Sequence, residues 1–182
     1  MMVLPKIYAI SDSKISLDNL SKKMLSKKKG DLMQVRAKKE SLTNIKKKLQ
    51  DSIRGNVLIN SSSFDDSDIQ PFLGIHLTSL DLFNVDLIKQ MKRQGAKCLS
   101  ASCHNEEEIE QANEVGCNFI TLSPVHQASC HPDAPTLGWE KFSQLATKAN
   151  MPVYALGGQT LHTLQTALKF GGYGVAGISG FW

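Results

Sequence analysis

The sequence predicts an α/β fold, a (β/α)8 barrel of the TIM type, on three observations. Short apolar runs rich in β-favouring residues recur eight times. Seven segments with apolar residues three and four positions apart separate them, as Ile109, Ala112 and Val115 illustrate. No linker composition interrupts the 182 residues, so residues 1–182 form one domain. Strands that alternate with helices pair in parallel. The alternative is an open doubly wound sheet, but no GxGxxG motif follows the first strand.

The expected elements alternate along the whole chain. The strands are residues 6–10, 31–37, 56–60, 74–77, 97–102, 119–123, 152–156 and 174–179. The helices are residues 17–26, 42–53, 67–72, 85–94, 106–115, 139–149 and 161–170. Five glycines stand where a helix ends and should take the C′ position, namely Gly30, Gly55, Gly95, Gly116 and Gly171. Since TIM barrels commonly have about 250 residues, this barrel should be minimal, with short loops.

The eighth expected strand is followed by Gly180-Phe181-Trp182 and by no helical segment. The barrel is therefore predicted to lack its final helix. An apolar strip on the outside of the barrel would then be exposed. We expect either the two terminal aromatic residues or a partner subunit, as in a homo-oligomer, to cover it.

Composition excludes several classes of protein. No stretch reaches the roughly 18 consecutive apolar residues that a membrane span needs. The N-terminal residues contain no long apolar segment typical of a signal peptide, so we expect a cytoplasmic protein with no membrane partner. The four cysteines, Cys98, Cys103, Cys117 and Cys130, show no CxxC spacing and should be free thiols.

Two lysine runs, residues 27–29 and 46–48, invite a nucleic-acid interpretation. The first closes an expected helix, where cations suit the helix dipole, and the second lies on the polar face of another. No aromatic residues are interleaved with them as stacking platforms. We therefore expect solvated faces and no nucleic-acid partner. The net charge of +4 suits a small phosphorylated ligand.

A polar triplet marks the second expected strand. Its apolar positions, from Met33 to Ala37, share one face, and Gln34, Arg36 and Lys38 share the other. If the polar face lines the mouth of a barrel, a guanidinium, an ammonium and an amide converge there on an anionic ligand. The alternative is a salt-bridge network inside the barrel mouth. Burial of these cations without an anion would be costly, which favours a ligand.

Glycine-containing segments follow the seventh and eighth expected strands, at Gly157-Gly158 and Gly177-Ile178-Ser179. In TIM barrels, ligands bind at the C-terminal ends of the strands, and the last two loops commonly form a phosphate site. Glycines let backbone N–H groups approach an anion closely. Two such ends on adjacent strands predict a phosphate-binding site.

Together, motifs in order along nearly the whole chain resemble the thiamine-phosphate synthase family, which includes the similar thiazole tautomerases. They are Gln34-Val35-Arg36-Ala37-Lys38, Gly74-Ile75-His76-Leu77 with Asp81-Leu82, Ser100-Ala101-Ser102-Cys103-His104, Ser123-Pro124-Val125, Leu137-Gly138, Ala155-Leu156-Gly157-Gly158 and Gly174-Val175-Ala176-Gly177-Ile178-Ser179. The resemblance implies a transferase of thiamine biosynthesis. It would join hydroxymethylpyrimidine diphosphate to a thiazole phosphate after pyrophosphate departs and leaves a pyrimidine carbocation.

The resemblance also assigns roles to residues. Gln34, Arg36, Lys38 and Asn60 fall on the pyrimidine diphosphate side, Ser102 stands beside the diphosphate, and Asp81 matches a ligand of Mg²⁺. The thiazole phosphate site corresponds to Gly158, Ile178 and Ser179, and His76, Gly157 and Gly177 complete the substrate-binding set. We name Arg36, Lys38, Ser102 and His131 as catalytic candidates.

The chain departs from the family pattern after the third and after the sixth expected strand. The family usually has Asn-Asp after the third strand, where this chain has Asn60-Ser61, so one magnesium carboxylate is missing. The loop after the sixth strand usually carries two threonines and a lysine, replaced here by Ala128-Ser129-Cys130-His131. His131, with an ordinary pKa near 6.5, would be partly charged at neutral pH.

These departures leave alternatives open. One is a tautomerase that moves protons on a thiazole phosphate, for which a histidine such as His131 or His126 is suited. Another is a catalytically silent barrel that binds thiamine-type phosphates. A third possibility for the loop residues is zinc held by Cys103, His104, Cys130 and His131, although adjacent Cys-His pairs fit no standard zinc motif.

Overall fold

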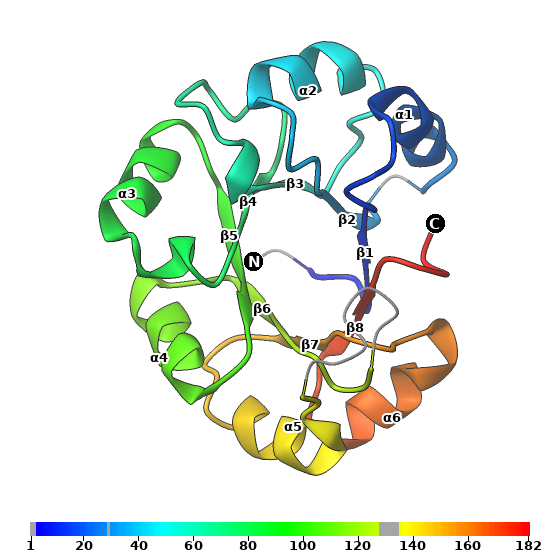
Figure 1. Ribbon diagram of the computed structural model, residues 1–182, viewed down its shortest axis with the longest axis vertical. Coiled ribbons are helices and arrows are strands. Elements are labelled where there is room, and N and C mark those ends of the chain that lie inside the picture. The colour runs from blue at the N-terminus through cyan, green and yellow to red at the C-terminus, as the bar shows by residue number, and fades with distance from the viewer. Residues whose placement is uncertain (1–2, 29, 128–134) are drawn as a thin grey trace.

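The computed structural model describes residues 3–28, 30–127 and 135–182 as a closed barrel of parallel strands (Figure 1). Each strand pairs with its neighbours in the sequence, and β8 pairs with β1 to close the ring. The eight strands are β1 (Ile7–Ile10), β2 (Leu32–Val35), β3 (Val57–Asn60), β4 (Gly74–Leu77), β5 (Cys98–Cys103), β6 (Phe119–Leu122), β7 (Val153–Ala155) and β8 (Gly174–Gly177). The predicted (β/α)8 barrel is therefore confirmed.

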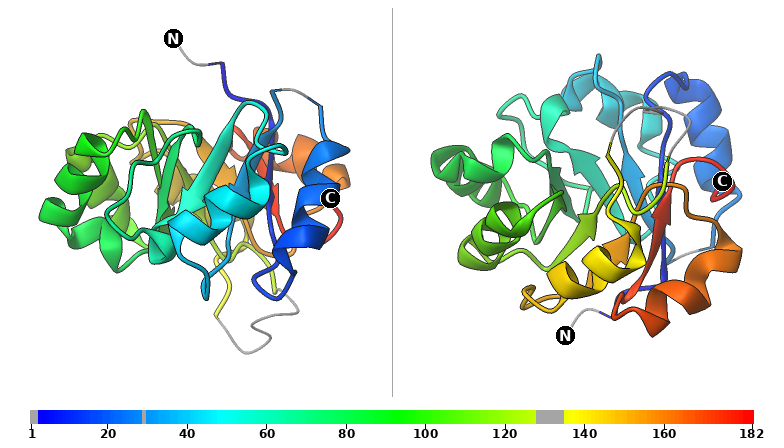
Figure 2. Two further views of the ribbon diagram at one scale, coloured as in Figure 1. Left: turned by 90° about the horizontal axis from the view of Figure 1, so that it is seen from above. Right: turned by 60° about the horizontal axis from the view of Figure 1, so that its bottom comes forward.

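Helices form a ring around these strands, as the two views of Figure 2 show. They are α1 (Leu17–Leu25), α2 (Leu42–Leu49), α3 (Val85–Arg93), α4 (Glu106–Val115), α5 (Gly138–Ala146) and α6 (Leu164–Lys169). Side-chain caps explain where α1, α2 and α4 begin. The side chains of Ser16, Ser41 and Asn105 each accept a hydrogen bond from a backbone N–H of the first turn. At the other end of α4, Gly116 takes the left-handed conformation predicted for it.

The helix predicted for residues 67–72 was wrong. The chain between β3 and β4 has a short 3₁₀ turn at Ser61–Ser63, and residues 67–72 are turns and irregular structure. Asp68 accepts the backbone N–H of Gln70, a local bond that competes with helix formation, and Pro71 can supply no helical N–H. Ile69 and Phe72 are nonetheless fully buried, so this segment covers the barrel without a helix. The helix-like spacing of Ile69 and Phe72 therefore reflects their burial and not a helix.

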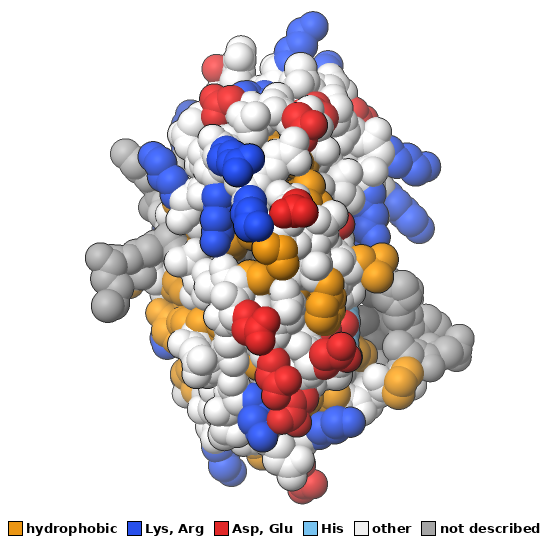
Figure 3. Space-filling view, turned by 90° about the vertical axis from the view of Figure 1, so that its left-hand side faces the viewer, with side chains coloured by type: hydrophobic (Ala, Val, Ile, Leu, Met, Phe, Trp, Pro, Cys, Tyr) orange, Lys and Arg blue, Asp and Glu red, His pale blue; other side chains and the backbone are white. Residues whose placement is uncertain are grey.

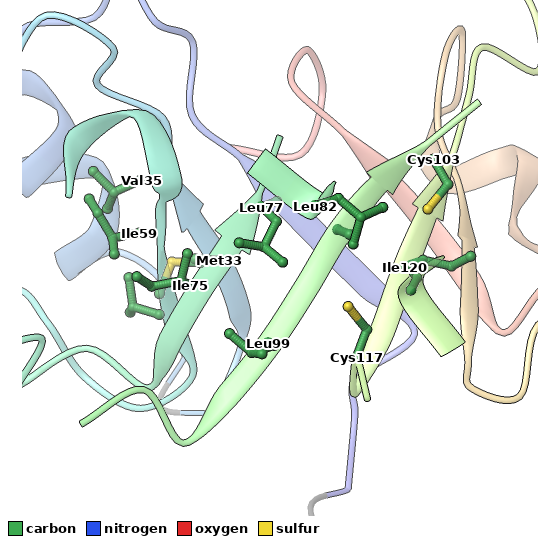
Figure 4. Close-up of a cluster of buried hydrophobic side chains, with 14 of the residues drawn as sticks. Met33, Val35, Ile59, Ile75, Leu77, Leu82, Leu99, Cys103, Cys117 and Ile120 are labelled. Carbon is green, nitrogen blue, oxygen red and sulfur yellow. The ribbon is translucent and has the colours of Figure 1, made fainter. Parts of the chain in front are cut away.

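Alternation along the strands divides the buried residues into two layers. An outer cluster between strands and helices includes Met33, Val35 and Cys103, and Figure 4 shows these side chains on one side of their strands. An inner cluster fills the barrel around Tyr8 and Tyr154. The outer layer anchors the helices, and the inner layer leaves polar side chains further along the same strands to face the open end of the barrel.

Aromatic rings and the N-terminal segment close the other end of the barrel. The rings of Tyr8 and Phe119 meet edge to face with centroids 5.2 Å apart. The hydroxyl of Tyr173 donates to the carbonyl oxygen of Leu4 at 2.6 Å, and Tyr154 donates to Pro5. With this end sealed, the strand C-termini carry the open end.

Phe181 and Trp182 cover the outside of the barrel beyond β8, as one of the two sequence-based alternatives predicted. Phe181 is 3% exposed and packs against Gly177, where an added Cβ would lie 2.2 Å from the Phe181 ring. The indole N–H of Trp182 donates to the carbonyl oxygen of Ile10 at 2.8 Å. Among the described residues, no helix follows β8.

The described part of the chain contains no helix with the length and apolar character needed to cross a bilayer. On the face shown in Figure 3, acidic and basic side chains are interspersed, with hydrophobic ones between them. Basic side chains therefore form no continuous stripe on that face.

Candidate functional site

A pocket of about 520 Å³ opens at the C-terminal end of the barrel. Its walls include most of the residues that the sequence singled out, and these come from six of the eight strands or the segments after them. The predicted residues that line it are Gln34, Arg36, Lys38, Asn60, His76, Ser102, Gly157, Gly158, Gly177, Ile178 and Ser179. The structure thus brings together eleven of the thirteen predicted site residues, and Asp81 and His131 are the two that remain.

The polar face of the β2 segment lines this pocket, as predicted. Gln34 is buried, Arg36 is half-buried and Lys38 is exposed at the rim. The hydroxyl of Ser11 accepts the backbone N–H of Arg36 at 2.8 Å and fixes the chain just beyond the strand. None of the ion pairs formed within residues 3–28, 30–127 and 135–182 involves Arg36 or Lys38. Two cations that face a pocket and have no carboxylate partner in the described segments suit an anionic ligand.

His76 on β4 lines the floor of the pocket and is surrounded by three hydroxyl groups. Its Nδ1 is 2.8 Å from the Ser100 hydroxyl and 3.3 Å from the Tyr8 hydroxyl, and its Nε2 is 2.9 Å from the Ser102 hydroxyl. Burial, with a smaller contribution from the nearby Arg36 charge, lowers the pKa of His76 to about 3. His76 is therefore a neutral imidazole at physiological pH and does not act as a cation in the site.

The segments after β7 and β8 line a separate part of the pocket wall. Gly157 and Gly158 both have positive φ values, 94° and 63°, which turn the chain sharply at the pocket. For the backbone N–H groups of Gly158, Ile178 and Ser179, no acceptor is found among the described residues. Backbone N–H groups that have no acceptor in the described segments and lie together at a pocket wall suit a phosphate.

Asp81 stands behind the pocket wall. Its Oδ2 accepts hydrogen bonds from the hydroxyls of Ser61 at 2.6 Å and Thr78 at 2.8 Å, and Thr78 itself lines the pocket. Ser61, at the position where the family pattern predicts a second carboxylate, thus contacts Asp81 directly. No group of three or more His, Cys, Asp or Glu side chains able to hold a metal is found in the described parts of the chain. The donor set fits Mg²⁺ only as an ion shared between one carboxylate and a phosphorylated ligand.

The suggested zinc set gains no support from its described half. Cys103 is the last residue of β5 and His104 follows it directly, and their side chains point in different directions. Cys103 is buried in the outer cluster, where burial raises the pKa of its thiol, and His104 lines the pocket. Cys130 and His131 lie outside the described residues. The catalytic role predicted for His131 therefore stays a prediction.

Three polar residues at or beneath the pocket were missed. Tyr8 and Ser100 hold His76, and Gln159 lines the pocket with its Nε2 donating to the Gly157 carbonyl at 2.6 Å. The alternation of side chains along a strand could have predicted Ser100, because Cys98, Ser100 and Ser102 share one face of β5. A polar residue directly after a glycine pair was the corresponding signal for Gln159.

Comparison with protein families gives one match that spans the barrel. A family model described as "Thiamine monophosphate synthase" matches residues 7–181. This stretch runs from the first residue of β1 to the buried Phe181 and includes every pocket residue.

Individual relatives agree with the family match. The chain is 34% identical over 188 aligned positions to the "Putative thiamine-phosphate synthase 2" of Aquifex aeolicus strain VF5, covering 99% of each chain. It is 26% identical to the thiamine-phosphate synthase of Caldivirga maquilingensis, covering 98% of this chain and 90% of that one. A solved thiamine phosphate pyrophosphorylase from Pyrococcus furiosus superposes with a TM-score of 0.67 at 20% identity, covering 96% of this chain and 85% of that one. That last likeness supports the fold.

Proposed function

The chain belongs to the thiamine monophosphate synthase family, and on that basis we propose that it is itself a thiamine-phosphate synthase. It would join hydroxymethylpyrimidine diphosphate to a thiazole phosphate and release pyrophosphate. The two relatives named above are described as a putative thiamine-phosphate synthase and a thiamine-phosphate synthase, which favours the synthase over a tautomerase or a catalytically silent barrel.

One observation carries this proposal: a single pocket has two separate walls whose groups suit an anion. Arg36 and Lys38 supply cations on one wall, and Gly158, Ile178 and Ser179 supply backbone N–H groups on the other. A diphosphate suits the cationic wall, and a monophosphate suits the neutral backbone cradle. A reaction that needs two phosphorylated substrates in one place requires both walls.

The pocket residues can perform three tasks in that reaction. Arg36 and Lys38 would stabilise the negative charge that develops on pyrophosphate as its bond to the pyrimidine methylene carbon breaks. The phosphate cradle would hold the thiazole so that its ring nitrogen captures the carbocation within the same pocket. Gln34 is 1% exposed, and its buried Nε2 finds no acceptor among the described residues, so it is available to a polar atom of the pyrimidine.

When bound, Mg²⁺ would neutralise part of the diphosphate charge. Asp81 is the carboxylate that would hold it, together with oxygens of the diphosphate. Since a second carboxylate is replaced by Ser61, we expect magnesium affinity in the absence of diphosphate to be low.

Titration calorimetry with each substrate tests the two walls separately. We expect hydroxymethylpyrimidine diphosphate to bind more tightly when Mg²⁺ is present, and thiazole phosphate to bind with or without the metal. An Arg36→Ala variant should weaken the first binding event and leave the second nearly unchanged. Failure of the wild-type protein to bind either compound would contradict the proposed function.

Replacing Ser61 with aspartate should create a magnesium-dependent stability. Ser61 is buried and its hydroxyl is 2.6 Å from Asp81, so the new carboxylate would face Asp81 at close range. Repulsion between two such carboxylates should lower the free energy of unfolding by about 1–2 kcal/mol in the absence of metal. Added Mg²⁺ should recover that loss, measured as a rise of about 3–8 °C in the melting temperature.

Ser61→Asn is the matched control, because asparagine has the shape of aspartate without its charge. Its melting temperature should not respond to Mg²⁺ more than that of the wild-type protein. An equal response of the aspartate and asparagine variants would show that Asp81 does not lie at a magnesium site.

A further inference from the structure

Four polar side chains form a continuous line from the sealed interior of the barrel to the pocket. Tyr8 and Ser100 are completely buried, His76 is 2% exposed, and Ser102 lines the pocket. Tyr8 and Ser100 approach Nδ1 of the imidazole, and Ser102 approaches Nε2. The neutral imidazole carries one ring proton, so its position decides which way each hydroxyl must donate.

The burial of Tyr8 and Ser100 determines that position. If Nδ1 carried the proton, it would donate a hydrogen bond to the Ser100 oxygen, and the Ser100 hydroxyl could in turn donate one to the Tyr8 oxygen. The Tyr8 O–H would then have no acceptor among the described residues, in a place that water does not reach. An unpaired buried hydroxyl is costly. A bare Nδ1 removes the problem because its lone pair accepts from the Ser100 hydroxyl at 2.8 Å and is shared with the Tyr8 hydroxyl at 3.3 Å.

A bare Nδ1 places the ring proton on Nε2. The Nε2–H group then donates to the Ser102 oxygen across 2.9 Å. Because the Ser102 oxygen accepts this hydrogen bond, the Ser102 O–H bond is oriented away from the imidazole. Ser102 lines the same pocket as Arg36 and Lys38, so this O–H is free to turn towards the region where an anion would lie.

We propose that Tyr8 and Ser100 are positioning residues that, through the Nε2–H tautomer of His76, make Ser102 a dedicated hydrogen-bond donor to an anionic oxygen of the ligand. This inference rests on the proposed function for the identity of the ligand, a diphosphate. It adds two residues that never touch the ligand and sets the direction of every hydrogen bond between them and the pocket. No proton is gained or lost by the chain.

The tautomer can be measured without any ligand. In ¹⁵N-labelled protein, long-range ¹H–¹⁵N spectra distinguish a bare ring nitrogen from a protonated one, and His76→Gln identifies the His76 signals by their loss. We expect a bare Nδ1 and a protonated Nε2. The double variant Tyr8→Phe with Ser100→Ala should lose this preference and show both tautomers. A protonated Nδ1 in the wild-type protein would overturn the proposal, whatever the protein binds.

A pair of substitutions at His76 tests the consequence for binding. The amide of glutamine reaches the Nε2 position and can still donate to Ser102, whereas the amide of asparagine reaches the Nδ1 position and cannot. We expect inorganic pyrophosphate to bind His76→Gln about tenfold more tightly than His76→Asn. Ser102→Ala should be as weak as His76→Asn, and the double variant of Tyr8 and Ser100 should also lose affinity.

The results separate this proposal from the proposed function. Equal pyrophosphate affinity of the His76→Gln and His76→Asn variants would overturn the positioning role. Absence of pyrophosphate and diphosphate binding by the wild-type protein, with the Nε2–H tautomer present, would instead refute the anionic ligand and so the proposed function. Spectra of the same samples report whether each variant is folded.

Discussion

Replacing Arg36 with alanine should lower kcat/KM for thiamine phosphate formation by at least about 100-fold. Arg36 is the guanidinium that faces the pocket without an ion-pair partner among the described residues. A guanidinium can bind two phosphate oxygens at once, and loss of one donor that stabilises transition-state charge costs about 100- to 1000-fold in rate. Initial rates of thiamine phosphate formation at varied diphosphate concentration measure this effect.

Two further variants make the result specific. Arg36→Lys keeps the charge but not the paired donors, so its kcat/KM should fall between those of the wild-type and alanine proteins. Arg54→Ala removes an exposed arginine that does not line the pocket and should leave turnover unchanged. Equal losses for Arg36→Ala and Arg54→Ala would indicate a general effect of net charge and contradict the assigned role.

Replacing Gly157 with alanine should lower the free energy of unfolding by about 3 kcal/mol. Gly157 has a φ of 94°, and an added Cβ would lie 2.8 Å from Pro124 Cα and 3.0 Å from the His126 carbonyl oxygen. The positive φ costs about 1–2 kcal/mol, and crowding against backbone that cannot move freely adds about 1–3 kcal/mol. The melting temperature should fall by about 10 °C.

Gly116→Ala separates the two contributions. Gly116 also has a positive φ, 75°, but nothing lies within 4 Å of an added Cβ. Its substitution should therefore cost only the conformational term, about 1 kcal/mol, or a fall of about 3 °C in the melting temperature. If both variants lose the same stability, close packing between the Gly157 turn and the Pro124 segment is not what requires glycine.

Alternation of side chains made most of the site predictable. Along β2 and the residue after it, Gln34 and Arg36 had to share a face once Met33 and Val35 were assigned to the opposite one, and the structure confirms both assignments. The glycine-containing ends after β7 and β8 were likewise predictable, because closure of a parallel barrel places the C-termini of adjacent strands together. These features depend on local pattern and topology alone.

Features that depend on long-range contacts were not predictable in the same way. Residues 67–72 carry buried apolar side chains at a helical spacing, but local side-chain hydrogen bonds and Pro71 exclude a helix. Tyr8 and His76 are 68 residues apart in the sequence, and only barrel closure brings them together. The engagement of Asp81 by Ser61 and Thr78 also required the folded geometry.

The measurement that tests the central claim most directly is turnover. The purified protein is incubated with hydroxymethylpyrimidine diphosphate, thiazole phosphate and Mg²⁺, and both thiamine phosphate and pyrophosphate are quantified. We predict equal molar amounts of the two products from the wild-type protein and at most about one-hundredth of that rate from Arg36→Ala. Binding of both substrates without any thiamine phosphate would contradict the assignment of synthase activity to this barrel.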